Sequence, residues 1–212
     1  MAEHKQQQRF EKPAPASYPV HELISRRWSP RSFTAQPVDR HQLAHLFEAA
    51  RWAPSSSNEQ PWAFLFGERG TAGWQKLFDT LVPFNQAWVK AAPVLVLGLA
   101  RKTFAANNNP NKFALYDLGQ AVGGLLVEAT ALGLSVHQMA GFDAGKARET
   151  FGIPETYEVG AMMAIGHGGH PESLSEQMRE RELAPRARNP IDSFVFEEEF
   201  GRHAEFPPAD GL

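Results

Sequence analysis

Arginine and serine side chains gather in one short segment that could bind an anion. The segment follows a helical stretch and contains Arg26, Arg27, Ser29, Arg31 and Ser32. A guanidinium group matches the oxygens of a phosphate bidentately and keeps its charge, and serine hydroxyls can donate to the same oxygens. A solvated surface turn could have the same composition, so the segment by itself leaves both interpretations open.

A second basic set lies near the C-terminal end of the chain. Its members are Arg179, Arg181, Arg186 and Arg188. This set is as compatible with a charged surface as with a phosphate site.

The stretch APSSSNEQPW, between a predicted helix and a predicted strand, has more polar side chains than a connector requires. Proline ends the helix, and one serine or asparagine could cap the next element. Such a role accounts for one or two of the five polar residues, which are Ser55, Ser56, Ser57, Asn58 and Gln60. This density of donors and acceptors predicts a ligand with many polar groups.

Several kinds of reactive site have no signal in the sequence. The chain has no cysteine, which excludes disulfides, thiolate nucleophiles and cysteine-ligated metals. It has no GxGxxG or Walker motif, no GxSxG elbow and no HExxH helix. His41 with His45, and His167 with His170, have ligand-like spacing but no convincing third ligand, so no metal site is predicted.

The composition is that of one globular domain. Of the 212 residues, 42% are hydrophobic and 21% are charged, and the formal net charge of -3 offers no field for nucleic acid. The longest apolar run, Ala91 to Ala100, is much shorter than the ~20 residues of a membrane span, and no signal peptide is recognisable. We therefore expect a cytoplasmic protein without a nucleic-acid or membrane partner.

Helical and strand patterns alternate along the chain. Asp39 and Gln42 have the spacing of a capping box, and Gly119, Gly123 and Gly124 lie inside the longest predicted helix. Each mid-helix glycine costs roughly 1 kcal/mol relative to alanine, so another element should approach that helix closely. The alternation predicts a three-layer α+β or α/β fold. Helices are expected at about residues 19–27, 39–53, 74–81, 85–91, 114–132 and 144–151, and strands at 63–67, 93–99, 135–139 and 159–165.

Several motifs together resemble the nitroreductase family of flavin enzymes. RWSPRSF at residues 27–33, Pro37-Val38 and EAARWAPSSSNEQPW follow the order and spacing of the family's N-terminal signature. Shorter matches continue in order, and the resemblance covers roughly residues 19–196. These matches are Asn85-Gln86, Ala92 to Val94, Asp117, Ala131 to Leu134, Gly141 to Asp143, Ile165 to His167 and Arg186 to Pro190.

The resemblance implies an α+β, nitroreductase-like three-layer fold with a central, mostly antiparallel sheet flanked by helices. It also implies an intertwined homodimer with one non-covalent FMN at each dimer interface. We accordingly expect a disordered N-terminal leader over residues 1–18 and an FMN-binding domain over residues 19–189. A C-terminal arm over residues 190–212 should extend over the partner subunit.

The resemblance also implies which residues bind the FMN. The phosphate and ribityl chain would be contacted by one group of residues, Arg27, Trp28, Ser29, Arg31, Arg186 and Arg188. The partner subunit would line the cofactor with Ser55, Ser56, Ser57 and Asn58, and Gln60 would add a ribityl contact. Asn85 would contact the pyrimidine edge, and the backbone of Gln138, Met139, Ala140 and Gly141 would run beside the ring. Amides there would stabilise the negative charge that the ring gains.

The activity that the resemblance implies is an FMN-dependent NAD(P)H oxidoreductase. NADH or NADPH would deliver a hydride, and a nitroaromatic, quinone or flavin acceptor would then take it at the same face, a ping-pong sequence that needs no catalytic side chain. Phe104, Phe113 and Tyr116, around the loop from Arg101 to Lys112, are candidate contacts for a small planar aromatic acceptor, unless they pack into the core. Alternatives are a flavin reductase that supplies a monooxygenase, a dehalogenase or oxidase, and a non-catalytic flavin-binding protein.

Overall fold

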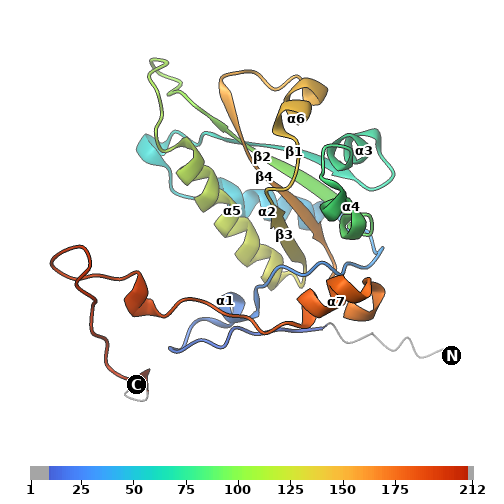
Figure 1. Ribbon diagram of the computed structural model, residues 1–212. Helices are drawn as coiled ribbons and strands as arrows, with labels where there is room; N and C mark the ends of the chain where they lie inside the picture. The colour runs from blue at the N-terminus through green and yellow to red at the C-terminus, as the bar shows by residue number, and fades with distance from the viewer. Residues whose placement is uncertain (1–9, 210–212) are drawn as a thin grey trace.

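One antiparallel sheet forms the centre of the molecule in the computed structural model, which describes residues 10–209. Its four strands are β1 (Trp62–Glu68), β2 (Val94–Arg101), β3 (Ser135–Met139) and β4 (Tyr157–Gly166), in the order β1-β2-β4-β3 (Figure 1). Each neighbouring pair is antiparallel, so the predicted sheet type is confirmed.

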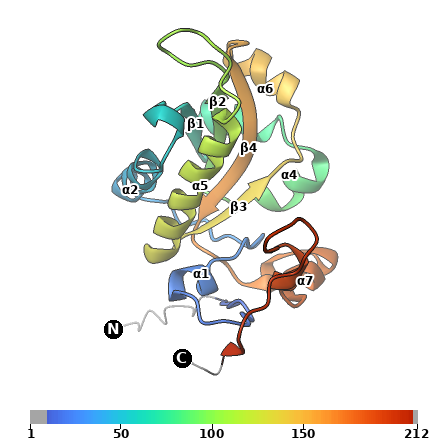
Figure 2. The same ribbon diagram turned by 90° about the vertical axis from the view of Figure 1, so that its left-hand side faces the viewer.

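Helices cover both faces of this sheet, as Figure 2 shows. Along β2, Val94 and Val96 pack toward α2 and α5, whereas Leu95 and Leu97 pack toward α3, α4 and α6. Because successive side chains of a strand point to opposite faces, the apolar run buries both of its sides, and the three-layer prediction is confirmed. The helices are α1 (Glu22–Arg26), α2 (Arg40–Arg51), α3 (Ala72–Phe78), α4 (Pro83–Val89), α5 (Ala114–Ala131), α6 (Ala144–Phe151) and α7 (Glu176–Leu183).

The packing of α2 against α5 depends on one glycine. A Cβ atom on Gly124 would lie 2.9 Å from the carbonyl oxygen of Ala49, so only glycine lets the two helices approach this closely. At Gly119 and Gly123 a Cβ would meet no atom within 4 Å. The predicted close approach is therefore confirmed within the chain at Gly124, and the other two glycines border open space. The capping box that opens α2 is also confirmed.

Helix α7 was not predicted from the sequence. It reads EQMREREL, and its two buried residues are Met178 and Glu182. A helix with one buried apolar side chain has no periodic apolar pattern, so the usual signal is missing. Three 3-10 turns, Ser56–Asn58, Pro171–Ser173 and Ile191–Ser193, complete the described elements.

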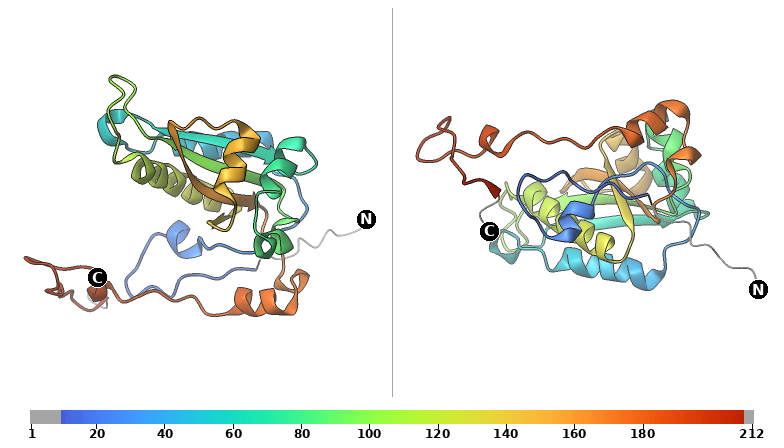
Figure 3. Two further views of the ribbon diagram at one scale, coloured as in Figure 1. Left: turned by 45° about the horizontal axis from the view of Figure 1, so that its top comes forward. Right: turned by 90° about the horizontal axis from the view of Figure 1, so that it is seen from below.

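The two terminal segments run side by side beneath the sheet (Figures 1 and 3). The N–H of Ala14 donates to the carbonyl oxygen of Ser25 at 2.8 Å, and the hydroxyl of Tyr18 donates to the carbonyl of Pro207 at 2.8 Å. Residues 10–18 thus contact the folded body, which differs from the disordered leader that we expected there. The part of that leader before residue 10 lies outside the described residues.

After α7 the C-terminal segment first runs along the N-terminal segment, where Arg186 is bonded to Lys12 and Ser25, and then continues beyond the sheet (Figure 1). Phe194 is 62% exposed and Phe200 is 93% exposed, although both are large apolar side chains. The position of this arm on a partner subunit stays a prediction.

Candidate functional site

Three arginines from opposite ends of the chain form one cluster. Burial lowers the pKa of Arg27, and the charge of Arg188 lowers it further. Burial also lowers the pKa of Arg186, with additional contributions from Arg27 and Arg188. Within residues 10–209 none of the three forms an ion pair with a carboxylate. The cluster is thus a set of mutually repelling cations, the arrangement that a phosphate dianion would neutralise.

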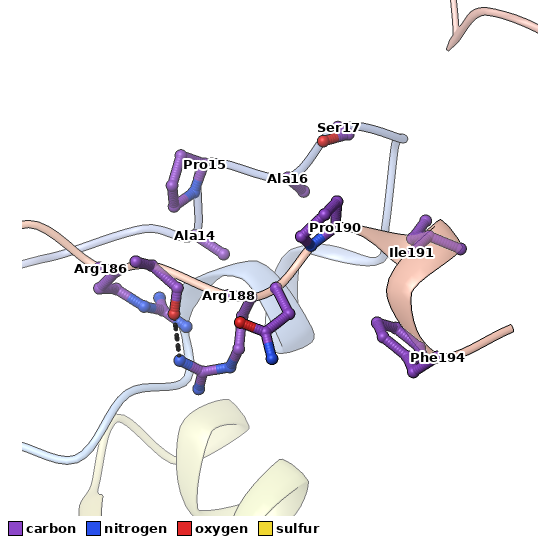
Figure 4. Close-up of a pocket in the computed structure, with 11 residues that line it drawn as sticks. Ala14, Pro15, Ala16, Ser17, Arg186, Arg188, Pro190, Ile191 and Phe194 are labelled. Atoms are coloured by element: carbon purple, nitrogen blue, oxygen red, sulfur yellow. Dashed lines mark hydrogen bonds between the residues drawn. The ribbon is translucent and has the colours of Figure 1, made fainter.

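A cavity of about 630 Å³ lies beside this cluster, between residues 14–17 and residues 186–191 (Figure 4). Arg186 and Arg188 belong to its wall, and the guanidinium of Arg188 donates to the carbonyl of Ala187 at 2.7 Å. The other two arginines of the second basic set are not part of this wall. Arg181 instead lies over the ring of Phe84 at 5.1 Å.

Arg31 is held by a buried carboxylate that the sequence did not single out. Glu182 of α7, 1% exposed, accepts the backbone N–H of Arg31 at 2.9 Å and that of Ser32 at 3.0 Å. Burial raises the pKa of Glu182, and these N–H donors partly oppose the rise. The guanidinium of Arg31 is 3.8 Å from the carboxylate, and its buried Nε has no partner within the described residues. That Nε is a donor still available to a ligand.

Trp28 and Ser29 connect this turn to its surroundings. The guanidinium of Arg27 donates to the hydroxyl of Ser29 at 3.3 Å. Trp28 is 9% exposed and contacts the ring of Phe10 edge-on. The indole is therefore covered by the N-terminal segment.

Strand β3 fixes the other side of the arginine turn. His137 lies 2.9 Å from the carbonyl of Pro30 through Nδ1, and its ring is 4.5 Å from that of Trp88. Burial lowers the pKa of His137 to about 4, so the ring is neutral at physiological pH. The sequence did not identify this residue as a site residue.

The segment from Gln138 to Gly141 continues from β3 toward α4. The amide nitrogen of Asn85 donates to the carbonyl of Gly141 at 2.9 Å, and a Cβ on Gly141 would be only 2.6 Å from that nitrogen. Met139 is buried, whereas Gln138 and Ala140 are exposed. The structure thus brings Asn85 to the backbone segment with which the sequence grouped it.

The serine-rich loop lies elsewhere, at the start of α5. The N–H of Ser56 donates to the carboxylate of Asp117 at 3.2 Å. Ser57, Asn58 and Gln60 all have positive φ angles, between 51° and 54°, which non-glycine residues rarely adopt. Backbone strain of this kind is found mainly at functional sites.

Some of the polar groups of this loop bind one another. The N–H of Gln60 donates to the hydroxyl of Ser55 at 3.0 Å, and its side-chain amide donates to the carbonyl of Asn58 at 3.0 Å. Gln60, for which we expect a ribityl contact, thus has its backbone N–H and its side-chain amide bonded within the loop, and the ribityl contact stays a prediction.

A cavity of about 330 Å³ joins this loop to two of the three predicted acceptor contacts. Its wall includes Ser55, Ser56, Phe113 and Tyr116, and the two aromatic side chains are 56% and 66% exposed. Phe104 is half-buried and does not contribute to the wall. Phe113 and Tyr116 are therefore placed where they could contact a planar molecule.

The two groups of predicted site residues lie at opposite ends of α5. The serine-rich loop contacts Asp117 in the first turn, whereas α1, which precedes Arg27, lies at the other end (Figure 1). An 18-residue helix is about 27 Å long. Within one chain the serine-rich loop and the arginine cluster do not meet.

The described residues contain no candidate metal cluster and no candidate membrane span. Between residues 10 and 209, no group of three or more His, Asp or Glu side chains could hold a metal ion. No helix in the same part of the chain is long and apolar enough to cross a bilayer.

The family relationship of the chain follows from comparison with known proteins. The model of the nitroreductase family matches residues 24–70 and 67–167. The chain belongs to the nitroreductase family. A crystal structure of an oxidoreductase containing FMN is 33% identical, with a TM-score of 0.84 over 88% of this chain and 96% of that one. The resemblance that the sequence motifs suggested is therefore confirmed.

Two further proteins are more distantly similar to the chain. A protein of Thermus thermophilus named NADH dehydrogenase is 28% identical over 174 residues, which are 67% of this chain and 83% of its own length. The structure of a nitroreductase family protein from Clostridium difficile is 23% identical, with a TM-score of 0.65 over 84% of this chain and 96% of that one. Residues 10–18 and α7 lie outside the part of the chain that the nitroreductase family model matches.

Proposed function

We propose that the chain is an FMN-dependent NAD(P)H oxidoreductase that reduces small planar aromatic acceptors such as nitroaromatics, quinones or free flavin. The observation that carries this proposal is the cluster of Arg27, Arg186 and Arg188, which have no carboxylate counter-ion among the described residues. Membership of the nitroreductase family and the FMN-containing relative support the same conclusion.

The residues of the cluster fit the cofactor's phosphate. Guanidinium groups bind phosphate oxygens through paired, charge-assisted hydrogen bonds, and the unpartnered Nε of Arg31 provides a further buried donor. Asn85 and Gly141 lie together at the end of β3, where they would border the flavin ring. When bound, FMN supplies the ring that accepts a hydride from NADH or NADPH and passes it to the acceptor. The protein's contribution is to hold and orient this ring and to stabilise its charge through backbone amides.

The complete site needs two copies of the chain. In one copy the serine-rich loop and the arginine cluster are separated by the length of α5, so the loop can cover the cofactor only from a partner subunit. The open face of α5 offers a contact surface, because Gly119 and Gly123 border open space and Leu115 and Val127 are exposed. A homodimer would cover these apolar side chains. In such a dimer, Phe113 and Tyr116 accompany the serine-rich loop to the partner's cofactor.

The proposal is tested with purified protein and its electron donors. We expect yellow protein with one FMN per chain, a dimer by light scattering, and loss of the flavin absorbance at about 450 nm when NADH or NADPH is added without oxygen. A nitroaromatic or a quinone should then restore the absorbance. Protein that stays colourless with excess FMN would refute cofactor binding. Protein that binds FMN but keeps its absorbance with both donors would instead be a flavin-binding protein without reductase activity.

A further inference from the structure

Residues 10–14 form an extended segment whose alternate side chains face the protein. Phe10, Lys12 and Ala14 are half-buried, whereas Glu11 and Pro13 are exposed. This period of two is that of an extended chain with one side on a surface. The ring of Phe10 meets Trp28 at 5.8 Å, and the N–H of Ala14 donates to the carbonyl of Ser25 at 2.8 Å. The segment is thus attached at both of its ends.

Lys12, in the middle of this segment, makes contacts through both its side chain and its backbone. Its ammonium group donates to the carbonyl of Glu182 at 2.6 Å and lies 5.4 Å from the centre of a Trp28 ring. Its carbonyl oxygen accepts a hydrogen bond of 2.7 Å from Nη1 of Arg186. The side chain of Lys12 therefore holds this residue in place, and the backbone carbonyl of Lys12 orients Arg186.

Arg186 is oriented by two carbonyl oxygens at once. Besides the bond to Lys12, its Nη1 donates to the carbonyl of Ser25 at 2.9 Å. The Lys12 ammonium is within electrostatic reach of Arg186 and Arg31, and Glu182 is the carboxylate that faces it. Burial lowers the pKa of Lys12, and the charge of Glu182 partly opposes this change. Lys12 thus adds positive charge to the arginine cluster and holds one of its members in place.

We propose that residues 10–14 position the phosphate site, with Lys12 as the positioning residue for Arg186. The inference rests on the proposed function, because it assumes that the arginine cluster binds the FMN phosphate. It concerns a part of the chain that precedes residue 24, where the match to the nitroreductase family begins. The consequence is that affinity for the phosphate, and not for the flavin ring, depends on the N-terminal segment.

The test compares FMN with riboflavin, which has the same ring and ribityl chain but no phosphate. Both are titrated into flavin-free protein, and binding is followed by the quenching of flavin fluorescence. The variants are Lys12→Met, Lys12→Arg and a deletion of residues 1–15, and Lys76→Met, an exposed lysine of α3, is the matched control. Thermal unfolding of each variant shows whether it folds.

We expect the deletion to weaken FMN binding about tenfold or more and Lys12→Met to weaken it about threefold to tenfold, since each loses charge or orientation at the phosphate. Riboflavin binding should stay within about twofold of the parent, and the FMN affinity of Lys12→Met should depend less on salt. Lys12→Arg keeps the charge and a donor for Glu182, so it should retain most of the FMN affinity. Lys76→Met should bind both ligands like the parent.

Two results would overturn the inference. One is an equal loss of FMN and riboflavin affinity, which would make the segment a general structural element. The other is parent-like FMN binding by both Lys12→Met and the deletion. If the parent protein itself binds no FMN, the proposed function fails, which is a different outcome from either of these.

Discussion

Glu182 and Arg31, 151 residues apart in the chain, are joined by a hydrogen bond of 2.9 Å from the backbone N–H of Arg31 to the buried carboxylate. The same carboxylate accepts the N–H of Ser32, so one side chain of α7 holds the turn that contains the arginines. This turn belongs to the match with the nitroreductase family, and α7 does not. The shape of the proposed phosphate site therefore depends on residues outside the family match.

Replacement of Glu182 by glutamine should destabilise the protein. The remaining oxygen can still accept the N–H groups of Arg31 and Ser32, but the amide nitrogen replaces the oxygen that faces the guanidinium of Arg31 at 3.8 Å. The buried N–H groups of the amide then have no acceptor there, which costs roughly 1–3 kcal/mol. Chemical denaturation measures this change in the free energy of unfolding. Glu180→Gln, an exposed position of the same helix, is the control and should have almost no effect. Equal stability of the two variants would contradict the structural role of Glu182.

Replacement of Arg188 by alanine should weaken FMN binding. Loss of one charged contact with the phosphate is worth roughly 1.5–3 kcal/mol, which is a 10- to 150-fold rise in the dissociation constant. Riboflavin, without a phosphate, should bind the variant and the parent alike. Arg179→Ala is the control, since Arg179 is not in the wall of the cavity beside the cluster. An unchanged FMN dissociation constant in Arg188→Ala would show that this residue is only a surface charge.

Substitution of Gly123 by alanine distinguishes a free helix face from a dimer contact. On a free face, where a new Cβ meets nothing in its own chain, alanine should stabilise α5 by roughly 1 kcal/mol. If this face is a dimer contact, Gly123→Ala should instead lower the melting temperature. Gly123→Leu, with its larger side chain, should dissociate the dimer. Light scattering and thermal unfolding measure both effects. Gly124→Ala should destabilise the protein in either case, because its Cβ meets the carbonyl of Ala49. A fully dimeric Gly123→Leu variant would place the interface elsewhere.

Replacement of Phe113 or Tyr116 by alanine should change the choice of acceptor. Stacking of an aromatic side chain on a planar acceptor contributes roughly 0.5–1.5 kcal/mol, so the ratio of kcat/KM between a nitroaromatic and a quinone should shift roughly 2- to 12-fold. The FMN content should stay near one per chain. Phe104→Ala is the control, since Phe104 is not in the wall of that cavity. Ratios within about twofold of the parent in both variants would exclude these residues as specificity elements.

His137 should make the stability of the protein depend on pH. Burial lowers its pKa from 6.5 to about 4, so the unfolded chain binds a proton there before the folded protein does. The contribution of His137 to the free energy of unfolding is therefore fully present above pH 6.5. It is lost as the pH falls toward 4, by up to roughly 3 kcal/mol. The difference in unfolding free energy between the parent and His137→Gln should shrink over this range. A difference that stays constant from pH 7 to pH 4.5 would mean that the histidine does not titrate as the structure indicates.

The elements of the fold were largely predictable because their signals are local. The Asp39 and Gln42 capping box, the apolar run that became β2 and the long helix α5 are each specified by residues within a few positions of one another. Helix α7 lacked such a signal, since Glu182 is buried by contacts with residues far away in the chain. The docking of Phe10, Lys12 and Ala14 had no such signal either, because the half-buried side includes a charged lysine and the exposed side a proline, so the residue types do not alternate.

By itself the sequence determined the residue types of the site, the motifs of the nitroreductase family and the order of the helices and strands before α7, because these depend on local periodicity and spacing. Only the tertiary structure decided which charges meet: it brought Arg27 to Arg186 and Arg188, and it left the serine-rich loop at the far end of α5. The physical reason is that contacts between distant residues follow from the packing of helices on both faces of the sheet, to which the whole chain contributes.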